Sequence, residues 1–404
     1  MSEKTDNKVP NVPNLRFIEY NASWQKCSLK SFTKRVTRKN VGQVSKRPLT
    51  ISAQYGLIDQ SEFFDRQIAS KDMSGYYLLK KGEFAYNKSY SNDYPWGAVK
   101  RLDKYECGAL STLYICFNLD NSIVNSDFIS HYFETNKWNK GVSDIAGEGA
   151  RNHGLLNMSV EDYFLTKHYL PFLIEQEKIS YFLNLITARI ETQSKIIEDL
   201  ELVKKGISNT VFGDKSVIKK SWKTIKLSTI LKERKTYDIK DSVYPHATLS
   251  KEGISAKTDR YNRDFLVKDE EKEYKITHLN DICYNPANLK FGVICLNTFG
   301  DAIFSPIYVT YEIDKKCDPY FISLYLTNPT FIGHIRKYEQ GTVYERMAVS
   351  SEDFLKGEIN LPTYEEQLKI AKTFKSIDEK IAIEQAILDK LKEQKKFLLS
   401  NMFI

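Results

Sequence analysis

The chain has 404 residues, of which 42% are hydrophobic and 27% charged, and its formal net charge at pH 7 is +7. This composition is that of a soluble globular protein, and the length predicts two or three domains. No run of 18 apolar residues is present, and the polar start MSEKTDNKVPNVPNL lacks the apolar region of a signal peptide. We therefore expect a cytoplasmic protein without a membrane span.

The chain begins with a polar segment, residues 1–15, that we predict to be a disordered tail. Residues 16–169 form a first globular domain, whose core over 84–117 is typical of strands broken by Asn-Asp, Pro and Gly. Residues 214–360 form a second domain and repeat this core in degenerate form over 282–311. We infer two related domains with a shared frame and divergent loops.

A long helix is predicted after each domain, over residues 170–213 and 361–404. Within these ranges, Leu170 to Phe212 aligns without a gap with Leu361 to Phe403, and 13 of the 43 aligned positions are identical. Apolar residues follow one another in steps of four and three, the pattern of a coiled-coil seam. The seam positions are Ile179, Leu183, Ile186 and Ile190 in the first copy and Ile370, Phe374, Ile377 and Ile381 in the second. Two matching seams favour a mutual antiparallel pair, related by a pseudo-twofold, over separate packing of each helix on its own domain.

Charge and motif content indicate binding and not catalysis. Two runs of basic residues, 34–47 and 215–235, are of a kind that is usually solvated surface, but their position early in each half also favours contact with a phosphate backbone. The six cysteines and six histidines show no metal-ligand spacing, so we predict no metal site. There is no GxxxxGK[ST] phosphate loop, and Asn285-Pro286 lacks the rest of an adenine methyltransferase loop, so we expect no catalytic residue.

Three features carry a resemblance to a known family. The domains open with WQKCSL and WKTIKL, the first core contains YNKSYS, YPWGAVKRL and GALSTLYI, and each helix opens with LPxxxEQxKI. Through these motifs the chain resembles, over essentially its whole length, the specificity subunit of a type I restriction-modification system. The resemblance implies an α+β fold with two target-recognition domains separated by two long antiparallel coiled-coil helices.

The same resemblance implies a partner set. The chain would bind double-stranded DNA at a bipartite target and scaffold two methyltransferase subunits and the restriction subunits, without catalysis of its own. S-adenosylmethionine, ATP and Mg²⁺ would belong to those partners, and this chain would hold no cofactor. The alternative is a stand-alone DNA nuclease or methyltransferase with diverged motifs.

Polar and cationic residues of the repeated core are the candidates for DNA contact, because amides and cations pair with base edges and lysines with phosphates. The candidates are Asn87, Lys88, Ser89, Tyr90, Lys100 and Arg101 in the first domain and Asn285, Asn288, Lys290 and Asn297 in the second. For each of them the alternative is a turn or surface position that makes no DNA contact.

Overall fold

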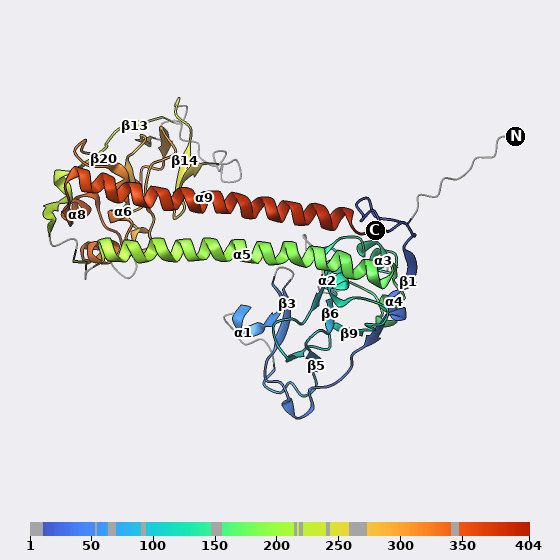
Figure 1. Cartoon of the computed structure of the whole chain (residues 1–404). Helices are drawn as coiled ribbons and strands as arrows, with labels where there is room; N and C mark the ends of the chain where they lie inside the picture. The colour runs from blue at the N-terminus through green and yellow to red at the C-terminus, as the bar shows by residue number, and fades with distance from the viewer. Residues whose placement is uncertain are drawn as a thin grey trace. The chain divides into compact units, whose positions relative to one another are not determined.

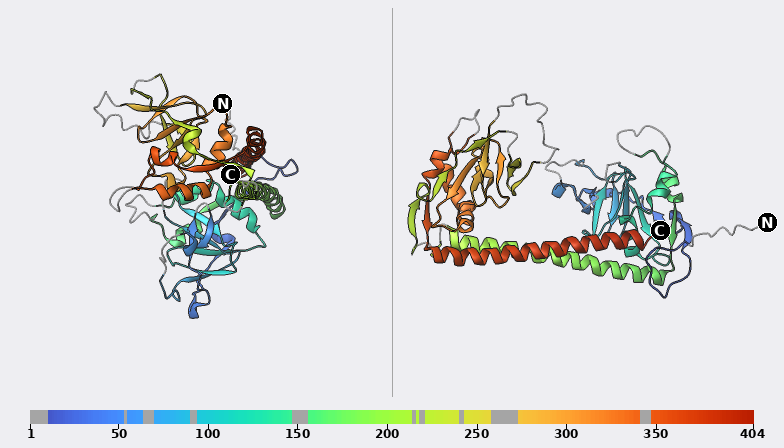
Figure 2. Two further views of the ribbon diagram at one scale, coloured as in Figure 1. Left: turned by 90° about the vertical axis from the view of Figure 1, so that its left-hand side faces the viewer. Right: turned by 90° about the horizontal axis from the view of Figure 1, so that it is seen from above.

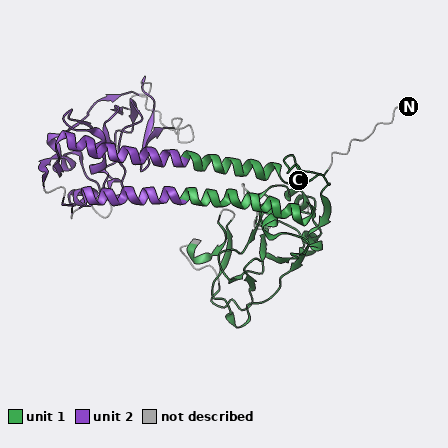
Figure 3. Cartoon of the chain, in the orientation of Figure 1, with its two compact units in different colours: residues 1–194, 386–404 green, residues 195–385 purple. Residues whose placement is uncertain are grey.

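The computed structural model describes residues 11–404 except 53–54, 64–69, 90–93, 147–155, 214–215, 218–220, 240–242, 258–272 and 341–346. It divides into two compact units, residues 1–194 with 386–404 and residues 195–385 (Figure 3). The two longest helices are α5 (Leu173–Phe212) and α9 (Tyr364–Asn401) (Figure 1). Each continues from one unit into the other (Figure 3). The first unit contains the start of α5 and the end of α9, and the second contains the reverse, so the two helices run antiparallel. Figure 2 shows this pairing from two further sides.

The first unit is built on an antiparallel four-stranded sheet in the order β2-β9-β6-β7. Its strands are β2 (Thr33–Arg35), β9 (Ile115–Leu119), β6 (Phe84–Asn87) and β7 (Ala98–Arg101). Aromatic residues that favour strands fill its buried face, where Phe84 and Phe117 lie opposite each other with ring centroids 5.5 Å apart. The described part of the unit also contains β1 (Gln25–Ser28), β3 (Leu49–Ser52), β4 (Gly56–Asp59), β5 (Tyr77–Lys80), β8 (Cys107–Leu110), β10 (Lys167–Leu170), α1 (Gln60–Phe63), α2 (Ser126–Glu134), α3 (Asn139–Ser143) and α4 (Val160–Leu165).

The second unit contains a four-stranded sheet with the same connection order, β12-β20-β17-β18. Its strands are β12 (Leu231–Glu233), β20 (Val309–Ile313), β17 (Ile282–Tyr284) and β18 (Ile294–Leu296). The described part of the unit also contains β11 (Lys223–Lys226), β13 (Tyr237–Asp238), β14 (Ala247–Ser250), β15 (Gly253–Ala256), β16 (Tyr274–Thr277), β19 (Ala302–Phe304), β21 (Glu358–Leu361), α6 (Pro319–Leu326), α7 (Pro329–Ile335) and α8 (Ser351–Leu355).

The predicted repeat is therefore confirmed in three dimensions, down to single side chains. Tyr86 and Tyr284 occupy the same strand of the two sheets, and both are wholly buried. Tyr86 stacks on Tyr163 of α4 with ring centroids 4.4 Å apart. Tyr284 stacks on Phe354 of α8 at 4.7 Å. Offset stacking of this kind stabilises a pair beyond its buried area, which explains why aromatic residues recur at these positions.

Gln176 and Gln367 explain the shared motif that opens each long helix. The Gln176 side chain accepts the backbone N–H of Asn125 at 2.9 Å and donates to the carbonyl of the proline five residues earlier at 2.9 Å. Gln367 repeats both bonds, with the N–H of Asp318 at 2.9 Å and its own preceding proline at 3.1 Å. Asn125 and Asp318 are the N-caps of α2 and α6. One buried glutamine thus ties the first turn of each long helix to a helix cap of its unit.

The far end of each long helix enters the core of the other repeat's unit. Phe403, just after α9, is 1% exposed, and its ring lies 5.1 Å from that of Phe128 in the first unit. Phe212, at the end of α5, is 2% exposed and lies 5.7 Å from Phe321 in the second. Since Phe212 and Phe403 are aligned in the repeat, each unit is completed by the start of one helical repeat and the end of the other.

The predicted seam residues fall into two groups. Ile179 and Leu183 are 1% and 0% exposed and belong to the core of the first unit together with Leu398 of α9. Phe374 is 1% exposed and belongs to the core of the second unit with Phe212 of α5. The other five, Ile186, Ile190, Ile370, Ile377 and Ile381, are half-buried. Each helix begins directly after the last strand of its domain, β10 or β21. Part of each seam therefore packs on its own domain, the arrangement that we expected less than a mutual pair.

The N-terminal segment departs from the predicted tail. Residues 1–10 lie outside the described residues. Within 11–15, which we assigned to the tail, the backbone N–H of Leu15 donates to the carbonyl of Asn401 at 2.9 Å. Arg16 follows with an ion pair to Glu175 at 2.7 Å. Residues 15 and 16 therefore tie the chain to the end of α9 and the start of α5.

Candidate nucleic-acid interface

Each unit has a hollow beside the last strand of its sheet. The first hollow, of about 950 Å³, lies along β7 and the segment from α2 to α3. The second, of about 690 Å³, lies along β18, α6 and α7. Gly97 and Gly292, with φ of 81° and 82°, line the two hollows just before these strands. A Cβ at Gly97 would lie 2.1 Å from the carbonyl oxygen of Asn87, so only glycine fits this turn. The matching positions make the hollows counterparts, and we take them as the candidate interface.

Asn87 and Asn285, which the sequence aligned, have the same local role. The Asn87 side-chain oxygen accepts the backbone N–H of Ser89 at 3.0 Å. The Asn285 oxygen accepts that of Ala287 at 3.1 Å. This side chain to backbone bond, two residues forward, shapes the loop that follows β6 or β17. Both side-chain oxygens therefore already accept a hydrogen bond within the loop. Tyr90, a neighbouring candidate, lies outside the described residues.

Lys88, Ser89 and Lys100 differ in whether they line the first hollow. Lys88 is half-buried, and its carbonyl accepts the backbone N–H of Leu156 at 3.0 Å, whereas Ser89 is exposed. Lys100 lines the hollow directly. Burial lowers the pKa of its ammonium group, an effect that Glu134 opposes and Lys395 reinforces. Of these three candidates, Lys100 is the one that the structure brings to the hollow.

Arg101 is held by carboxylates of its own unit. Its Nη1 lies 2.7 Å from Asp127 Oδ1 at the start of α2, and its Nε lies 2.6 Å from Asp103 Oδ1. The side chain is 17% exposed. Two acidic partners already neutralise the guanidinium, so it fastens β7 to α2 and is a poor candidate for the base contact that we predicted.

Of the candidates in the second domain, Lys290 lines the second hollow, whereas Asn285, Asn288 and Asn297 do not. Asn288 is the N-cap of the 3-10 helix η8 (Leu289–Phe291), and its backbone carbonyl accepts the N–H of Phe291 at 3.0 Å. Lys290 is exposed, lines the hollow, and places its Nζ 5.1 Å from the centroid of the Phe291 ring. Phe291 is itself 63% exposed. A cation beside an exposed aromatic ring is suited to a phosphate with its neighbouring base or sugar.

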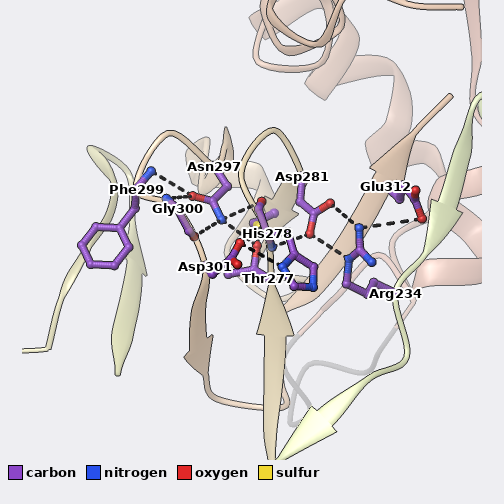
Figure 4. A network of polar contacts seen from close by, with 10 residues as sticks. Arg234, Thr277, His278, Asp281, Asn297, Phe299, Gly300, Asp301 and Glu312 are labelled. Atoms are coloured by element: carbon purple, nitrogen blue, oxygen red, sulfur yellow. Dashed lines mark hydrogen bonds and ion pairs between the residues drawn. The ribbon is translucent and has the colours of Figure 1, made fainter. Parts of the chain in front are cut away.

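Asn297 is not available for base contact, contrary to our prediction. Its side chain is 0% exposed and lies at the centre of a polar network (Figure 4). The amide nitrogen faces Thr277 Oγ1 at 2.9 Å and the carbonyls of His278 at 2.8 Å and Gly300 at 2.9 Å. The oxygen accepts the backbone N–H of Phe299 at 2.9 Å and of Gly300 at 3.1 Å. The residue holds the turn between β18 and β19 and has a structural role.

The predicted basic runs also supply structural ion pairs. Arg38 in the first run lies 2.7 Å from Glu83, which is 7% exposed. Arg234 in the second lies 2.9 Å from Asp281, which is 2% exposed (Figure 4). These arginines compensate buried carboxylates, because an unpaired buried charge is costly. Exposed lysines such as Lys46 are the members of the runs that can reach a phosphate.

Sequence reasoning missed several residues that line the first hollow. Tyr55 is 70% exposed and Tyr94 is 36% exposed. Trp138 lines the same hollow, as do Lys392 and Lys396 from the last turns of α9. The motif YPWGAVKRL contains Tyr94 and Lys100, but the lysines of α9 lie almost 300 positions later, where they are also typical of a helix C-terminus. Sequence spacing alone therefore carries no signal that brings them together.

The described residues contain no group of three or more His, Cys, Asp or Glu side chains placed to hold a metal ion. All six cysteines are free thiols, and burial raises the pKa of Cys116 to about 12. None of the described helices combines the length and the apolarity that crossing a membrane requires.

Comparison with known proteins relates the chain to DNA specificity domains. Residues 219–393 match the family model described as type I restriction modification DNA specificity domain. A search of curated proteins finds no significant match. Among solved structures, the type I restriction-modification system S subunit from M. genitalium is 15% identical with a TM-score of 0.57, covering 97% of this chain and 99% of that chain. A chain from a study of complex assembly and conformational transition of the type I R-M system is 13% identical with a TM-score of 0.55, covering 94% and 97%. At these identities the two structures show a common fold along the chain.

Proposed function

We infer that this chain, which carries a type I restriction modification DNA specificity domain over residues 219–393, is the DNA-recognising subunit of a type I restriction-modification system. The observation that carries the inference is the duplication. The same sheet order, glutamine bonds and helix-end contacts are built twice, whereas the hollows beside β7 and β18 have different linings.

We propose that each unit reads one half of a split double-stranded DNA target. The first hollow presents Tyr94 and Lys100, and the second presents Lys290, Phe291 and Arg336. Cations of this kind bind phosphates and fix the register on the duplex, while differing side chains at the base edges select sequence. Since the frame is shared and the linings differ, the two half-sites should have different sequences.

We propose that the long helices carry the partner enzymes. In the first unit, α5 exposes Ile174, Tyr181 and Leu185, which are 71%, 66% and 51% exposed. Their spacing of seven and four residues places them on one helix face. Exposed apolar residues gathered on one face are typical of protein interaction sites. Two methyltransferase subunits would dock on the helices, and the restriction subunits would join them.

This division of work assigns no catalytic residue to the chain. S-adenosylmethionine, ATP and Mg²⁺ would be bound by the partners, and the adenine to be methylated would be flipped into a partner's pocket. The present chain would recognise the target sequence and set the spacing of the two half-sites.

The test is sequencing of methylated adenines in DNA from cells that express this chain with its methyltransferase partner. We expect a split motif with a gap of fixed length, absent when this chain is omitted. A continuous motif, or methylation that does not depend on this chain, would refute the proposal. Replacing residues 16–169 with the corresponding domain of a relative should change one half of the motif only, and a change in both halves would contradict independent reading.

A further inference from the structure

The end of α9 lines the first hollow, but the end of α5 has no such position in the described part of the second unit. Lys392, Lys395 and Lys396 from the last turns of α9 line the first hollow together with Lys100 of β7. The described residues that line the second hollow come from strands, loops, α6 and α7. The two hollows therefore differ in a feature that the repeat does not predict.

The first hollow holds an excess of positive charge. Among the described residues that line it, Glu134 is the acidic one, and it is paired with Lys395 at 3.0 Å. The pKa of Glu134 is lowered to about 2 by His131 and Lys395 although its burial acts in the opposite direction. This carboxylate is therefore charged at neutral pH and offsets one lysine. Lys100, Lys392 and Lys396 remain, and the last two are exposed.

The walls of the same hollow provide a further donor. Trp138 is 3% exposed, and its indole N–H has no acceptor among the described residues. A buried donor without a partner is unfavourable unless a ligand or solvent oxygen satisfies it. Tyr94 and Trp96 add aromatic surface beside it. Cations, an N–H donor and aromatic surface together suit an anionic oxygen attached to a sugar and base.

Alignment of the two helices explains the asymmetry. The positions in α5 that correspond to Lys392 and Lys396 are Glu201 and Lys205. Glu201 carries the opposite charge, and Lys205 is exposed but is not among the residues that line the second hollow. The lysine aligned with Lys395 is Lys204, which forms an ion pair with Asp378 of α9.

We propose that the last turns of α9 are part of the DNA interface of the first unit, with Lys392 and Lys396 binding backbone phosphates of the first half-site. This inference rests on the proposed DNA recognition and adds a residue set outside the two recognition domains. It also makes the two half-sites unequal, since α9 contributes phosphate contacts to the first and α5 contributes none to the second.

The test uses the chain in complex with its methyltransferase subunits and a fluorescent duplex that contains the methylated motif. Dissociation constants are measured from low to moderate salt for the wild type and for the double variant Lys392→Gln, Lys396→Gln. Each lost phosphate contact lowers the slope of log affinity against log salt by about 0.9. We therefore expect the slope of the double variant to be smaller than that of the wild type by about 1.8, while the motif that is methylated stays the same. The matched control is Lys205→Gln on α5, which should keep the wild-type slope. The variant Lys392→Arg, Lys396→Arg should also keep it.

Phosphate ethylation interference then locates the effect. We expect the double variant to lose interference in the first half-site, the half that changes when residues 16–169 are exchanged, and to keep it in the second. A wild-type slope in the double variant, or an equal decrease with Lys205→Gln, would overturn this inference while leaving the proposed function intact. A wild-type complex that shows no preference for the motif duplex would overturn both.

Discussion

Replacing Asn297 with alanine should weaken the second unit without changing the bases that are recognised. The side chain is wholly buried and makes five hydrogen bonds. Truncation would leave two backbone N–H groups and two carbonyls around the turn without these partners. A buried polar group that loses its partner costs about 1–3 kcal/mol, and entering water or relaxation recovers part of the sum. We expect the free energy of unfolding of the second unit to fall by about 3–6 kcal/mol, a large part of the roughly 5–15 kcal/mol of an ordinary domain.

Urea unfolding followed by hydrogen exchange and mass spectrometry would report the two units separately. Peptides from 274–313 should lose protection at lower urea, and peptides from 84–119 should not change. The matched control is Asn288→Ala, since the Asn288 side chain makes no capping hydrogen bond, and its effect should stay within about 1 kcal/mol. A stable Asn297→Ala protein whose complex with the methyltransferase subunits modifies an altered half-site would refute this reasoning and restore the residue as a base contact.

Three further results are expected. Gln176→Ala should destabilise the first unit and Gln367→Ala the second, each by about 2–4 kcal/mol, through the loss of three side-chain hydrogen bonds at Gln176 and two at Gln367. Exchange that rises in both units after either change would contradict this. Burial lowers the pKa of His168 to about 4, so on acidification the unfolded chain binds a proton at this imidazole before the folded chain does, and stability is lost as pH falls from about 6.5 toward 4. The melting temperature of His168→Gln should therefore depend less on pH than that of the wild type, and an equal dependence would exclude the effect. Seven residues inserted after Glu191 and after Ala382 keep the heptad register and lengthen each helix by roughly 10 Å, so the preferred gap between the half-sites should grow by up to about three base pairs. An unchanged preference, measured by methylation of a DNA library in which the gap length varies, would show that the helices do not set the gap.

The duplication and the fold class were predictable because they rest on repeated side chains. Gln176 with Gln367 and Phe212 with Phe403 recur at one offset, and identical residues at equal spacing report equal surroundings. The purpose of each pair was not readable, because the partner of Gln176 is a helix cap 51 residues earlier in the chain. Periodicity likewise predicted the helices, but it does not distinguish a seam residue that faces the partner helix from one, such as Leu183, that lies in a domain core.

The surroundings of the candidate DNA contacts could not be predicted from the sequence, for a physical reason. An asparagine after a strand has the same appearance in sequence whether its amide bonds a base or, like Asn297, its own backbone. Arg101 resembles a free cation until Asp127, from a different element, is placed beside it. Lys100 and Lys396 meet in one hollow although nearly 300 residues separate them. Such sites are created by tertiary packing and leave no local pattern.

Each unit contains the start of one long helix and the end of the other, so the two halves of the chain could be encoded in the opposite order. Leu15 bonds to Asn401 within the first unit, so the first described residues lie beside the last turn of α9, and the passage from Phe212 toward β11 is the equivalent place in the second repeat. A chain joined from 404 to 11 by a short linker, and opened between 213 and 221, would retain the contacts of both units with its halves in the opposite order. A gene that encodes this rearranged chain should yield a protein that binds the same DNA.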